Sequence, residues 1–397
     1  MKVIIIGNGI AGQTAADLIR KQESETEISI FTKENFPYYS RIFLPHYIAD
    51  QITLEKLVIR NEKWYKKRNI KIHLGTEIAK INRQEKYILI TGQNKRYFYD
   101  KLIIASGSNA RKFPYNNPDI KGMFTLRNIA DADEIKAYIP ENNVKDVFII
   151  GGGLLGIELG YHLRELKINV AICDINQYLL SRQLDAETSD LLRKYLESKG
   201  IKIICGEKIA QILGKDKVTG VISESGMKIK TDLILQQVGV IPEITIAKEA
   251  EILTDRGIKV NGFMQTNDSD IYAIGDCVQF EGKIWGIIPA CMDQASIAAN
   301  HILGRNPEPY KGTQWSVRLK IAGIKLSCFG PPPSCDSNEE QLIEIVDKDS
   351  FKCRKVVIKD NKLKSAVLMG PGKDKYFMKN LGKDVDIKEI QEKLREE

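Results

Sequence analysis

The residues best suited to chemistry are glycines that follow a short apolar run in the middle of the chain. Residues 147–150 (VFII) are typical of a buried parallel strand, and Gly151, Gly153 and Gly156 follow them in a turn that leads into a helix. Glycine at these positions permits a sharp turn, lets backbone N–H groups approach a pyrophosphate, and lets the helix pack closely on the strand. A second β-rich run ends on Asp174, where a carboxylate can accept a hydrogen bond from a ribose hydroxyl. The complete strand–turn–helix–strand–acid pattern predicts a dinucleotide site.

The same pattern opens the chain. Residues 2–6 (KVIII) precede Gly7, Gly9 and Gly12, and a second strand is expected over residues 28–31. Thr32 stands at the end of that strand, so Glu34 is the nearest acid for an adenosine ribose. The repetition argues against glycine turns that bind nothing, and it predicts a second dinucleotide site.

Three further segments end in small residues that bring backbone, rather than bulky side chains, against a ligand. One apolar run ends in Ala105-Ser106-Gly107, a second reaches Gly239, and residues 266–276 (TNDSDIYAIGD) end in Gly275-Asp276. The Asp276 carboxylate can accept hydrogen bonds from a polyol. A proline-opened helix is predicted over residues 289–303, and its first N–H groups favour an anionic or electron-rich ligand atom.

Composition limits the classes of protein. The chain has 397 residues, enough for two or three domains, and no run of about 18 apolar residues that would span a membrane. The N-terminus enters a strand after one lysine, so no signal peptide is expected. Seven cysteines form no CxxC pair, which favours reduced thiols in a cytoplasmic protein. The net charge of +7 indicates solvated lysine faces or a surface that attracts an acidic partner, and no motif supports nucleic-acid binding.

Five segments (GNGIAG, ASG, GGGLLG, GVIP and TNDSDIYAIGD) give the chain a resemblance to the two-dinucleotide flavoproteins of the glutathione reductase type. The resemblance implies FAD, with Asp276 on its ribitol, and NADH at the central glycine turn. The cofactor-binding residues that it implies are Gly7, Gly9, Ala11, Gly12, Glu34, Arg41, Ile78, Ala105, Ser106, Gly107, Arg127, Gly275, Asp276 and Gln294, together with Gly151, Gly153, Leu155, Gly156, Asp174, Arg182 and Gly239.

The patterns and the resemblance together predict an α/β fold with two Rossmann-like dinucleotide-binding domains, the NAD domain being inserted in the FAD domain. The FAD-binding domain is expected over residues 1–110 and 245–309, and the NAD(H)-binding domain over residues 111–244. The composition changes near residue 310, where short β-like runs begin. A small C-terminal α+β domain is therefore expected over residues 310–397.

The missing cysteines narrow the subfamily. Disulfide reductases of this superfamily carry a redox-active cysteine pair in the first domain, and this chain has no cysteine before Cys173. Relatives that reduce coenzyme A disulfide use one cysteine in a segment similar to YSRIFLPHY, where Ile42 stands here. The segment YSRIFL, the run RQLD at 182–185 and the run LKIAGIKLSCFG at 319–330 are instead similar to NADH:rubredoxin oxidoreductases and to the flavin half of assimilatory nitrite reductases.

Two residues are candidates for a catalytic pair. In ferredoxin reductases of aromatic-ring oxygenases, a lysine paired with a glutamate lies beside the flavin, and His46 and Glu158 match these positions here. The alternative is a surface histidine and a glutamate that packs on its helix. Asp174 would accept from a 2′-OH and repel a 2′-phosphate, while Arg182 could soften the repulsion, so NADH is expected over NADPH.

We therefore expect an NADH-dependent FAD oxidoreductase that passes electrons to a small acidic carrier such as rubredoxin or ferredoxin, in the cytoplasm. The alternatives are the flavin and NADH component of a nitrite-reductase-like multisubunit reductase, and a redox-sensing flavoprotein that turns over no acceptor. An NADH oxidase is disfavoured because the cysteine that such oxidases commonly use is absent. The spacing of Cys328, Cys335 and Cys353 matches no usual zinc or iron–sulfur pattern, so no metal is expected.

Overall fold

The computed structural model describes residues 1–321, 324–334 and 339–396, with the backbone alone for residues 319–321. The chain packs into two compact units. Unit 1 comprises Met1–Arg41, Thr53–Asn109 and Val240–Thr313, and unit 2 comprises Ile42–Ile52, Ala110–Gly239 and Gln314–Glu397. The predicted division into three domains stays a prediction. Among the described residues, no helix has both the length and the apolar character needed to cross a membrane.

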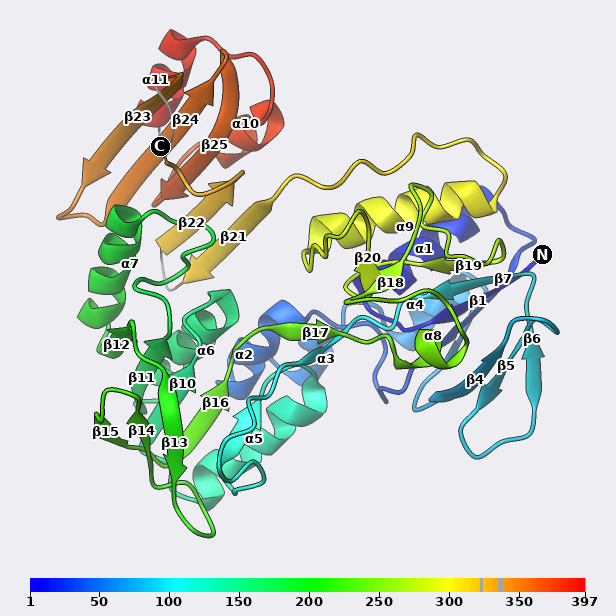
Figure 1. Cartoon of the computed structure of the whole chain (residues 1–397), viewed down its shortest axis with the longest axis horizontal. Coiled ribbons are helices and arrows are strands. Elements are labelled where there is room, and N and C mark those ends of the chain that lie inside the picture. Colours follow the sequence, from blue (N-terminus) through cyan, green and yellow to red (C-terminus); the bar gives the residue numbers. More distant parts are fainter. Residues whose placement is uncertain (322–323, 335–338, 397) are drawn as a thin grey trace. The chain divides into compact units, whose positions relative to one another are not determined.

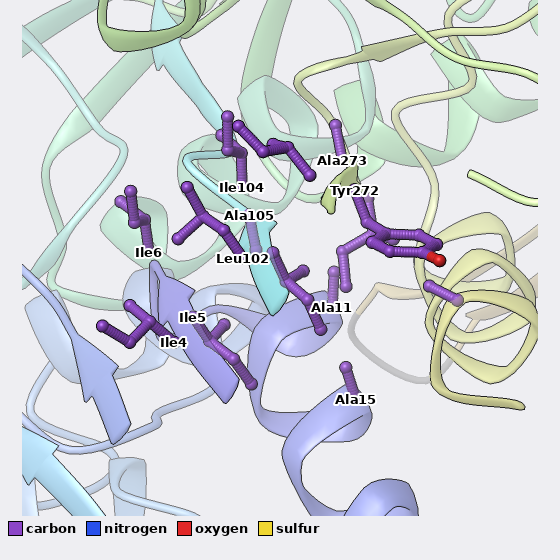
Figure 2. Packing of buried hydrophobic residues seen from close by; sticks show 14 of the residues in the cluster. Ile4, Ile5, Ile6, Ala11, Ala15, Leu102, Ile104, Ala105, Tyr272 and Ala273 are labelled. Atoms are coloured by element: carbon purple, nitrogen blue, oxygen red, sulfur yellow. The ribbon is translucent and has the colours of Figure 1, made fainter. Parts of the chain in front are cut away.

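A parallel sheet with the strand order β19-β7-β1-β2-β3 forms the centre of unit 1 (Figure 1). Its strands are β1 (Lys2–Ile6), β2 (Glu27–Phe31), β3 (Ile70–His73), β7 (Lys101–Ile104) and β19 (Ile271–Ala273). Near-continuous apolar runs of this kind suit a parallel sheet that is covered on both faces. Helices α1 (Ile10–Gln22) and α9 (Ile288–Ile302) pack side by side, and Ala11 and Ala15 of α1 share one buried cluster with Ile5 and Leu102 (Figure 2).

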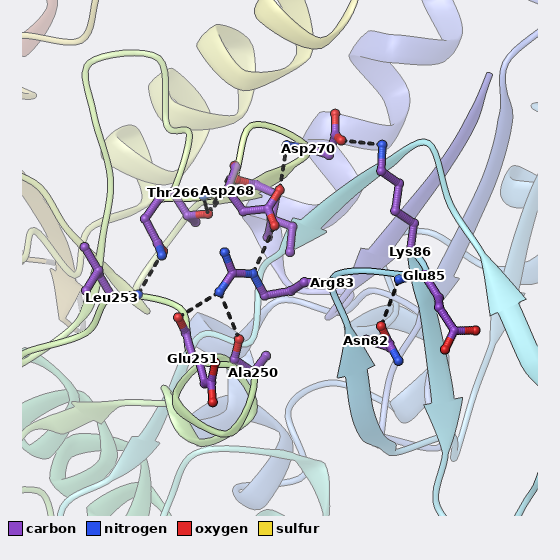
Figure 3. A network of polar contacts seen from close by, with 12 residues as sticks. Asn82, Arg83, Glu85, Lys86, Ala250, Glu251, Leu253, Thr266, Asp268 and Asp270 are labelled. Atoms are coloured by element: carbon purple, nitrogen blue, oxygen red, sulfur yellow. Dashed lines mark hydrogen bonds and ion pairs between the residues drawn. The ribbon is translucent and has the colours of Figure 1, made fainter.

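Arg83 fastens a small antiparallel sheet, β4-β5-β6, to the rest of unit 1 (Figure 3). Its Nε donates to Asp268 Oδ2 at 3.0 Å, and its Nη1 donates to the carbonyl of Glu251 at 2.9 Å. Shorter elements in unit 1 or at its boundaries are β4 (Ile78–Asn82), β5 (Tyr87–Ile90), β6 (Arg96–Phe98), β8 (Ser108–Ala110), β17 (Val240–Pro242), β18 (Ile258–Lys259), β20 (Val278–Gln279), η1 (Arg41–Phe43), α3 (Leu54–Leu57), α4 (Glu62–Lys67) and α8 (Thr245–Glu249).

Unit 2 repeats the parallel sheet of unit 1, with the strand order β9-β16-β10-β11-β12. Its elements are β9 (Met123–Thr125), β10 (Asp146–Ile150), β11 (Asn169–Asp174), β12 (Ile201–Cys205), β16 (Leu233–Gln236), α5 (Ile129–Glu141), α6 (Leu154–Glu165), α7 (Ala186–Ser198), and an antiparallel sheet of β13 (Ile209–Leu213), β14 (Gly220–Ser223) and β15 (Lys228–Lys230). In each unit, the strand before the glycine turn lies between the strand that follows the helix and the strand that comes later in the chain. The short helix α2 (Leu44–Ile48) packs against α5 and α6.

The C-terminal part of unit 2 is an antiparallel sheet with the order β21-β22-β25-β24-β23 and two helices (Figure 1). Its elements are β21 (Ser316–Ile321), β22 (Ile324–Phe329), β23 (Glu340–Asp347), β24 (Lys352–Lys359), β25 (Lys362–Met369), α10 (Asp374–Asn380) and α11 (Ile387–Arg395). Buried Lys355 of β24 joins this sheet to the start of α7, because its Nζ donates to Asp185 and to Glu187, each at 2.7 Å. The sheets confirm the predicted α/β class with two Rossmann-like folds.

Candidate functional site

The first glycine turn requires glycine at two of its three positions. Gly7 has φ +105°, and a Cβ there would overlap the carbonyl of Ala105. A Cβ on Gly12 would overlap the carbonyl of Gly7, so the first turn of α1 lies directly on the turn. Gly9 has the opposite surroundings, since no atom lies within 4 Å of a Cβ built there. The turn therefore leaves open space in front of the backbone that leads into α1, where a pyrophosphate fits.

The second glycine turn repeats this geometry. Gly151 has φ +113°, and a Cβ there would overlap the carbonyl of Gln237. A Cβ on Gly156 would overlap the carbonyl of Gly151, while nothing lies within 4 Å of a Cβ on Gly153. The two turns thus match position by position, so the geometry agrees with the prediction of a second dinucleotide site in unit 2.

A buried side chain supports a polar ligand at the first turn. Asn8 lies between Gly7 and Gly9 and is 8% exposed. Its Oδ1 accepts from Tyr65 Oη at 3.0 Å, but its buried Nδ2 has no hydrogen-bond partner within the described parts of the chain. A buried donor without a partner is costly, so a ligand acceptor at this position agrees with FAD.

Gly275 and Asp276, both predicted to bind FAD, lie in a loop that Ala11 and Gln294 contact. Ser108 Oγ donates to Asp276 Oδ2 at 2.9 Å. Gly275 has φ +87°, packs against Ala11, and donates its N–H to Gln294 Oε1 at 2.7 Å. Gln294 is 1% exposed and holds this loop through that bond. Cys291 Sγ approaches the second Asp276 oxygen at 3.7 Å.

Glu34 and Arg41, both predicted to contact FAD, contact each other. Arg41 Nη2 donates to Glu34 Oε1 at 2.6 Å, and Tyr39 Oη donates to Glu34 Oε2 at 2.5 Å. Burial alone would lower the pKa of the Arg41 guanidinium, but the charges of Tyr39, Glu34 and Asp276 together raise it. Arg41 and Tyr39 thus fix the position of the Glu34 carboxylate.

Asp174 occupies the end of β11 beside the second turn. Its Oδ2 accepts the N–H of Gly152 at 2.6 Å, and its Oδ1 accepts the N–H of Asn176 at 2.8 Å. These bonds fix the carboxylate at the edge of the turn. Arg182 is exposed and lines a cavity of about 750 Å³ with C-terminal residues such as Trp315 and Lys362. Arg182 thus faces a different set of residues from those that hold Asp174.

His46 lies in α2, where its ring meets a histidine that the sequence analysis did not single out. The His46 and His162 ring centroids are 3.9 Å apart, with an interplanar angle of 43°. Burial and the charge of His46 lower the pKa of buried His162 to about 4, although the nearby Glu165 acts in the opposite direction. Glu158 lies four residues before His162 on α6, and burial raises its pKa to about 7. The predicted His46–Glu158 pair stays a prediction, and the structure places His162 beside His46.

The other predicted positions lie at the ends of elements. Ile78 opens β4 and packs on the core of unit 1, Ser106 Oγ donates to the carbonyl of Glu243, and Leu155 is in the first turn of α6. Gly107 and Gly239 have φ +74° and +96°, so both keep the backbone conformation that favours glycine. Arg127 precedes α5, where its N–H donates to Asp131, and lies in unit 2.

Two of the three C-terminal cysteines, Cys328 and Cys353, lie among the described residues. No group of three or more His, Cys, Asp or Glu in the described ranges is arranged to hold a metal ion. Cys328 and Cys353 are buried free thiols, and burial raises the pKa of each. Cys335, the third cysteine of the predicted thiol set, lies outside the described residues.

Residues 1–299 match a protein-family model described as pyridine nucleotide-disulphide oxidoreductase. The chain belongs to this family. It is 32% identical to the NADH-rubredoxin oxidoreductase of Clostridium acetobutylicum. The alignment covers 93% of this chain and 91% of that enzyme. The crystal structure of the Clostridium acetobutylicum NADH:rubredoxin oxidoreductase has a TM-score of 0.76 and 29% identity, with coverage of 96% and 93%. The chain is also 31% identical to the nitrite reductase (NAD(P)H) of Bacillus subtilis over 98% of its own length.

The match to the nitrite reductase is partial on the other side. It covers 48% of that enzyme, so the chain spans about half the length of this relative. Membership of the family confirms the predicted recognition, the flavin oxidoreductase class, and FAD and NADH as cofactors. Where each predicted residue contacts a cofactor stays a prediction.

Proposed function

We propose that this chain takes electrons from NADH and passes them through FAD to a small one-electron carrier protein such as rubredoxin. The observation that carries this proposal is the lack of cysteine in the two segments where the thiol-dependent reductases carry their redox cysteines. No cysteine precedes Cys173, Ile42 replaces the single cysteine of the coenzyme A disulfide reductases, and the six described cysteines are all free thiols. Electrons therefore leave directly from the flavin. Bound FAD supplies the chemistry, which is acceptance of a hydride and release of electrons one at a time.

The residues of the chain bind and orient the cofactors. The turn at Gly7 and the carboxylates of Glu34 and Asp276 would hold FAD, and the turn at Gly151 with Asp174 would hold NADH. The Asp174 carboxylate is fixed beside the turn, where it would disfavour the 2′-phosphate of NADPH. We propose His46 and Glu158 as the catalytic pair, with hydride transfer as the step that a His46→Ala variant would slow.

Charge supports an acidic partner. The chain carries 59 Lys and Arg against 52 Asp and Glu, a net charge of +7, and opposite charge speeds association at low salt. The similarity to the NADH-rubredoxin oxidoreductase of Clostridium acetobutylicum over nearly the whole of both chains favours a rubredoxin-type carrier. Free thiols in the described cysteines support a reducing compartment, so a cytoplasmic location is part of the proposal.

A second candidate function is the flavin and NADH component of a nitrite-reductase-like assembly. It is favoured by the match that covers almost all of this chain and about half of the Bacillus subtilis enzyme.

Anaerobic turnover tests the proposal. FAD-loaded protein is mixed with NADH and, in separate reactions, with rubredoxin, ferredoxin and O2. We expect fast rubredoxin reduction that falls steeply with added salt, and a kcat/KM for NADH well above that for NADPH. Rapid flavin reduction without turnover of any soluble carrier contradicts the proposal and favours the assembly. Equal kcat/KM values for the two nucleotides contradict the role of Asp174.

A further inference from the structure

The two glycine turns differ in the residue whose carbonyl meets their first glycine. In unit 1, the carbonyl that meets the first glycine belongs to Ala105, and in unit 2 it belongs to Gln237. The two residues have the same backbone role, because each follows the strand that lies next to the strand before the turn. Gln237 therefore places an amide where the other dinucleotide fold has only a methyl group.

The Gln237 side chain begins beside the first turn of α6. Its Cβ is 3.5 Å from the position of a Cβ built on Gly156, a residue of the first turn of that helix. The Nε2 atom is buried and has no hydrogen-bond partner in the parts of the chain that the structure describes. Neighbouring Gln236 is different, since its Oε1 accepts the N–H of Phe113 at 2.9 Å. Gln236 is thus satisfied within the fold, and Gln237 is not.

The first turn also has a buried amide donor without a partner in the described parts of the fold, but there the donor belongs to the turn itself. Asn8, the middle residue of that turn, has a buried Nδ2 without a partner among the described residues, and Gly152 occupies the matching position in unit 2. Each turn therefore has one unpartnered amide donor, from the turn itself in unit 1 and from the facing strand in unit 2. A feature that recurs at both cofactor turns through different residues points to an acceptor that both cofactors share.

We propose that Gln237 binds the nicotinamide nucleotide, its amide donating to an oxygen acceptor of the nucleotide at the second glycine turn. The backbone N–H groups and the positive end of the dipole at the start of α6 also favour an anionic acceptor, such as a phosphate oxygen. A buried donor left without an acceptor destabilises the nucleotide-free fold. Gln237 therefore opposes stability until the nucleotide is bound.

The proposal is tested with Gln237→Ala, which installs the residue found at the equivalent position of unit 1, and with Gln237→Glu, which keeps the shape and removes the donor. Gln211→Ala, at an exposed position of β13 in the same unit, is the matched control. Binding of NAD⁺ to FAD-loaded protein is measured by calorimetry, because NAD⁺ does not reduce the flavin. The melting temperature is measured without nucleotide, and the flavin spectrum reports FAD content.

We expect Gln237→Ala to raise the Kd for NAD⁺ about tenfold, the effect of one hydrogen bond. We expect its melting temperature without nucleotide to rise, its FAD content to stay unchanged, and Gln237→Glu to bind NAD⁺ more weakly still. Gln211→Ala should match the parent protein in all three measurements. An unchanged Kd in Gln237→Ala overturns the proposal. A lower melting temperature without nucleotide also overturns it, because that result means that the amide is satisfied within the fold.

Discussion

Replacement of Glu158 by glutamine should stabilise the protein, and the gain should grow with pH. Glu158 is half-buried on α6, and burial raises its pKa to about 7 from an ordinary value of 4.5. Glutamine keeps the shape of the side chain and cannot ionise. The Glu158→Gln variant therefore removes the free energy of holding a carboxylate in this environment and leaves the packing of α6 in place.

The size of the effect follows from the pKa. Between pH 4.5 and pH 7 the folded state keeps a proton on Glu158 that the unfolded state has lost, so the free energy of unfolding falls as pH rises through this range and is flat above it. At 1.36 kcal/mol for each pKa unit, the full loss is roughly 3 kcal/mol. At pH 5 only a small part of the loss has occurred. The advantage of Glu158→Gln over the parent protein should therefore grow by about 2.5 kcal/mol from pH 5 to pH 8.

Urea unfolding of both proteins at pH 5 and pH 8, followed by tryptophan fluorescence, measures this change. Titrations shared by the two proteins cancel in the comparison. Glu165→Gln on the same helix is the control, because that side chain is 42% exposed and its replacement should change the difference little. An advantage of Glu158→Gln that is the same at both pH values would falsify the reasoning, since it would come from packing rather than from an ionised carboxylate.

Three further predictions follow from the described contacts. Gly151→Ala should abolish NAD⁺ binding and keep FAD, while Gly7→Ala should lose FAD, because in each case the new Cβ overlaps a facing carbonyl. A flavin spectrum and a NAD⁺ titration measure the two effects. Tight NAD⁺ binding by Gly151→Ala contradicts this prediction. Lys355→Met should lower the free energy of unfolding by about 3 kcal/mol, because it leaves Asp185 without its buried cation. Urea unfolding measures this loss, and comparison with Lys348→Met, at an exposed position, shows whether burial is the reason. His162→Phe should weaken the loss of stability between pH 6.5 and pH 4, because the unfolded imidazole takes up a proton that buried His162 refuses; an unchanged slope in acid unfolding contradicts this.

The parallel sheets could be predicted because their chemistry is local. A run such as residues 147–150 between turn residues leaves few alternatives to a buried strand, and the structure has β10 at Asp146–Ile150. The C-terminal strands were harder. The sequence indicates a strand over residues 355–358, but β24 spans Lys352–Lys359. Arg354, which lies outside the indicated range, is buried, and a polarity pattern treats such a residue as exposed. Carbonyl oxygens and carboxylates far along the chain satisfy Arg354 and Lys355.

The site residues likewise divide into those set by local sequence and those set by contacts between distant residues. Glycine positions could be predicted because the turn itself demands glycine, and the structure shows the overlap at Gly7 and Gly151 that explains it. His162 was missed because its neighbour His46 lies more than a hundred residues away in sequence. Its spacing of four from Glu158 was a signal that could have found it. Gln237 could be found only by comparing the two turns in the structure, because the sequence does not show which carbonyl faces which glycine.

Satisfied and unsatisfied buried groups separate structure from function around α6. Lys355 is buried with its ammonium hydrogen-bonded to two carboxylates, so its loss should only destabilise. Glu158 and Gln237 are the reverse, because burial opposes the charge of one and leaves the Nε2 of the other without a partner in the described chain. Groups that oppose stability in a fold persist where a ligand or a reaction needs them. If both Glu158→Gln and Gln237→Ala stabilise the protein, and the first slows flavin reduction while the second weakens NAD⁺ binding, then the start and one face of α6 form a functional surface. If both stabilise without either loss, the two groups are imperfections of the fold and the catalytic role of Glu158 fails with the binding role of Gln237.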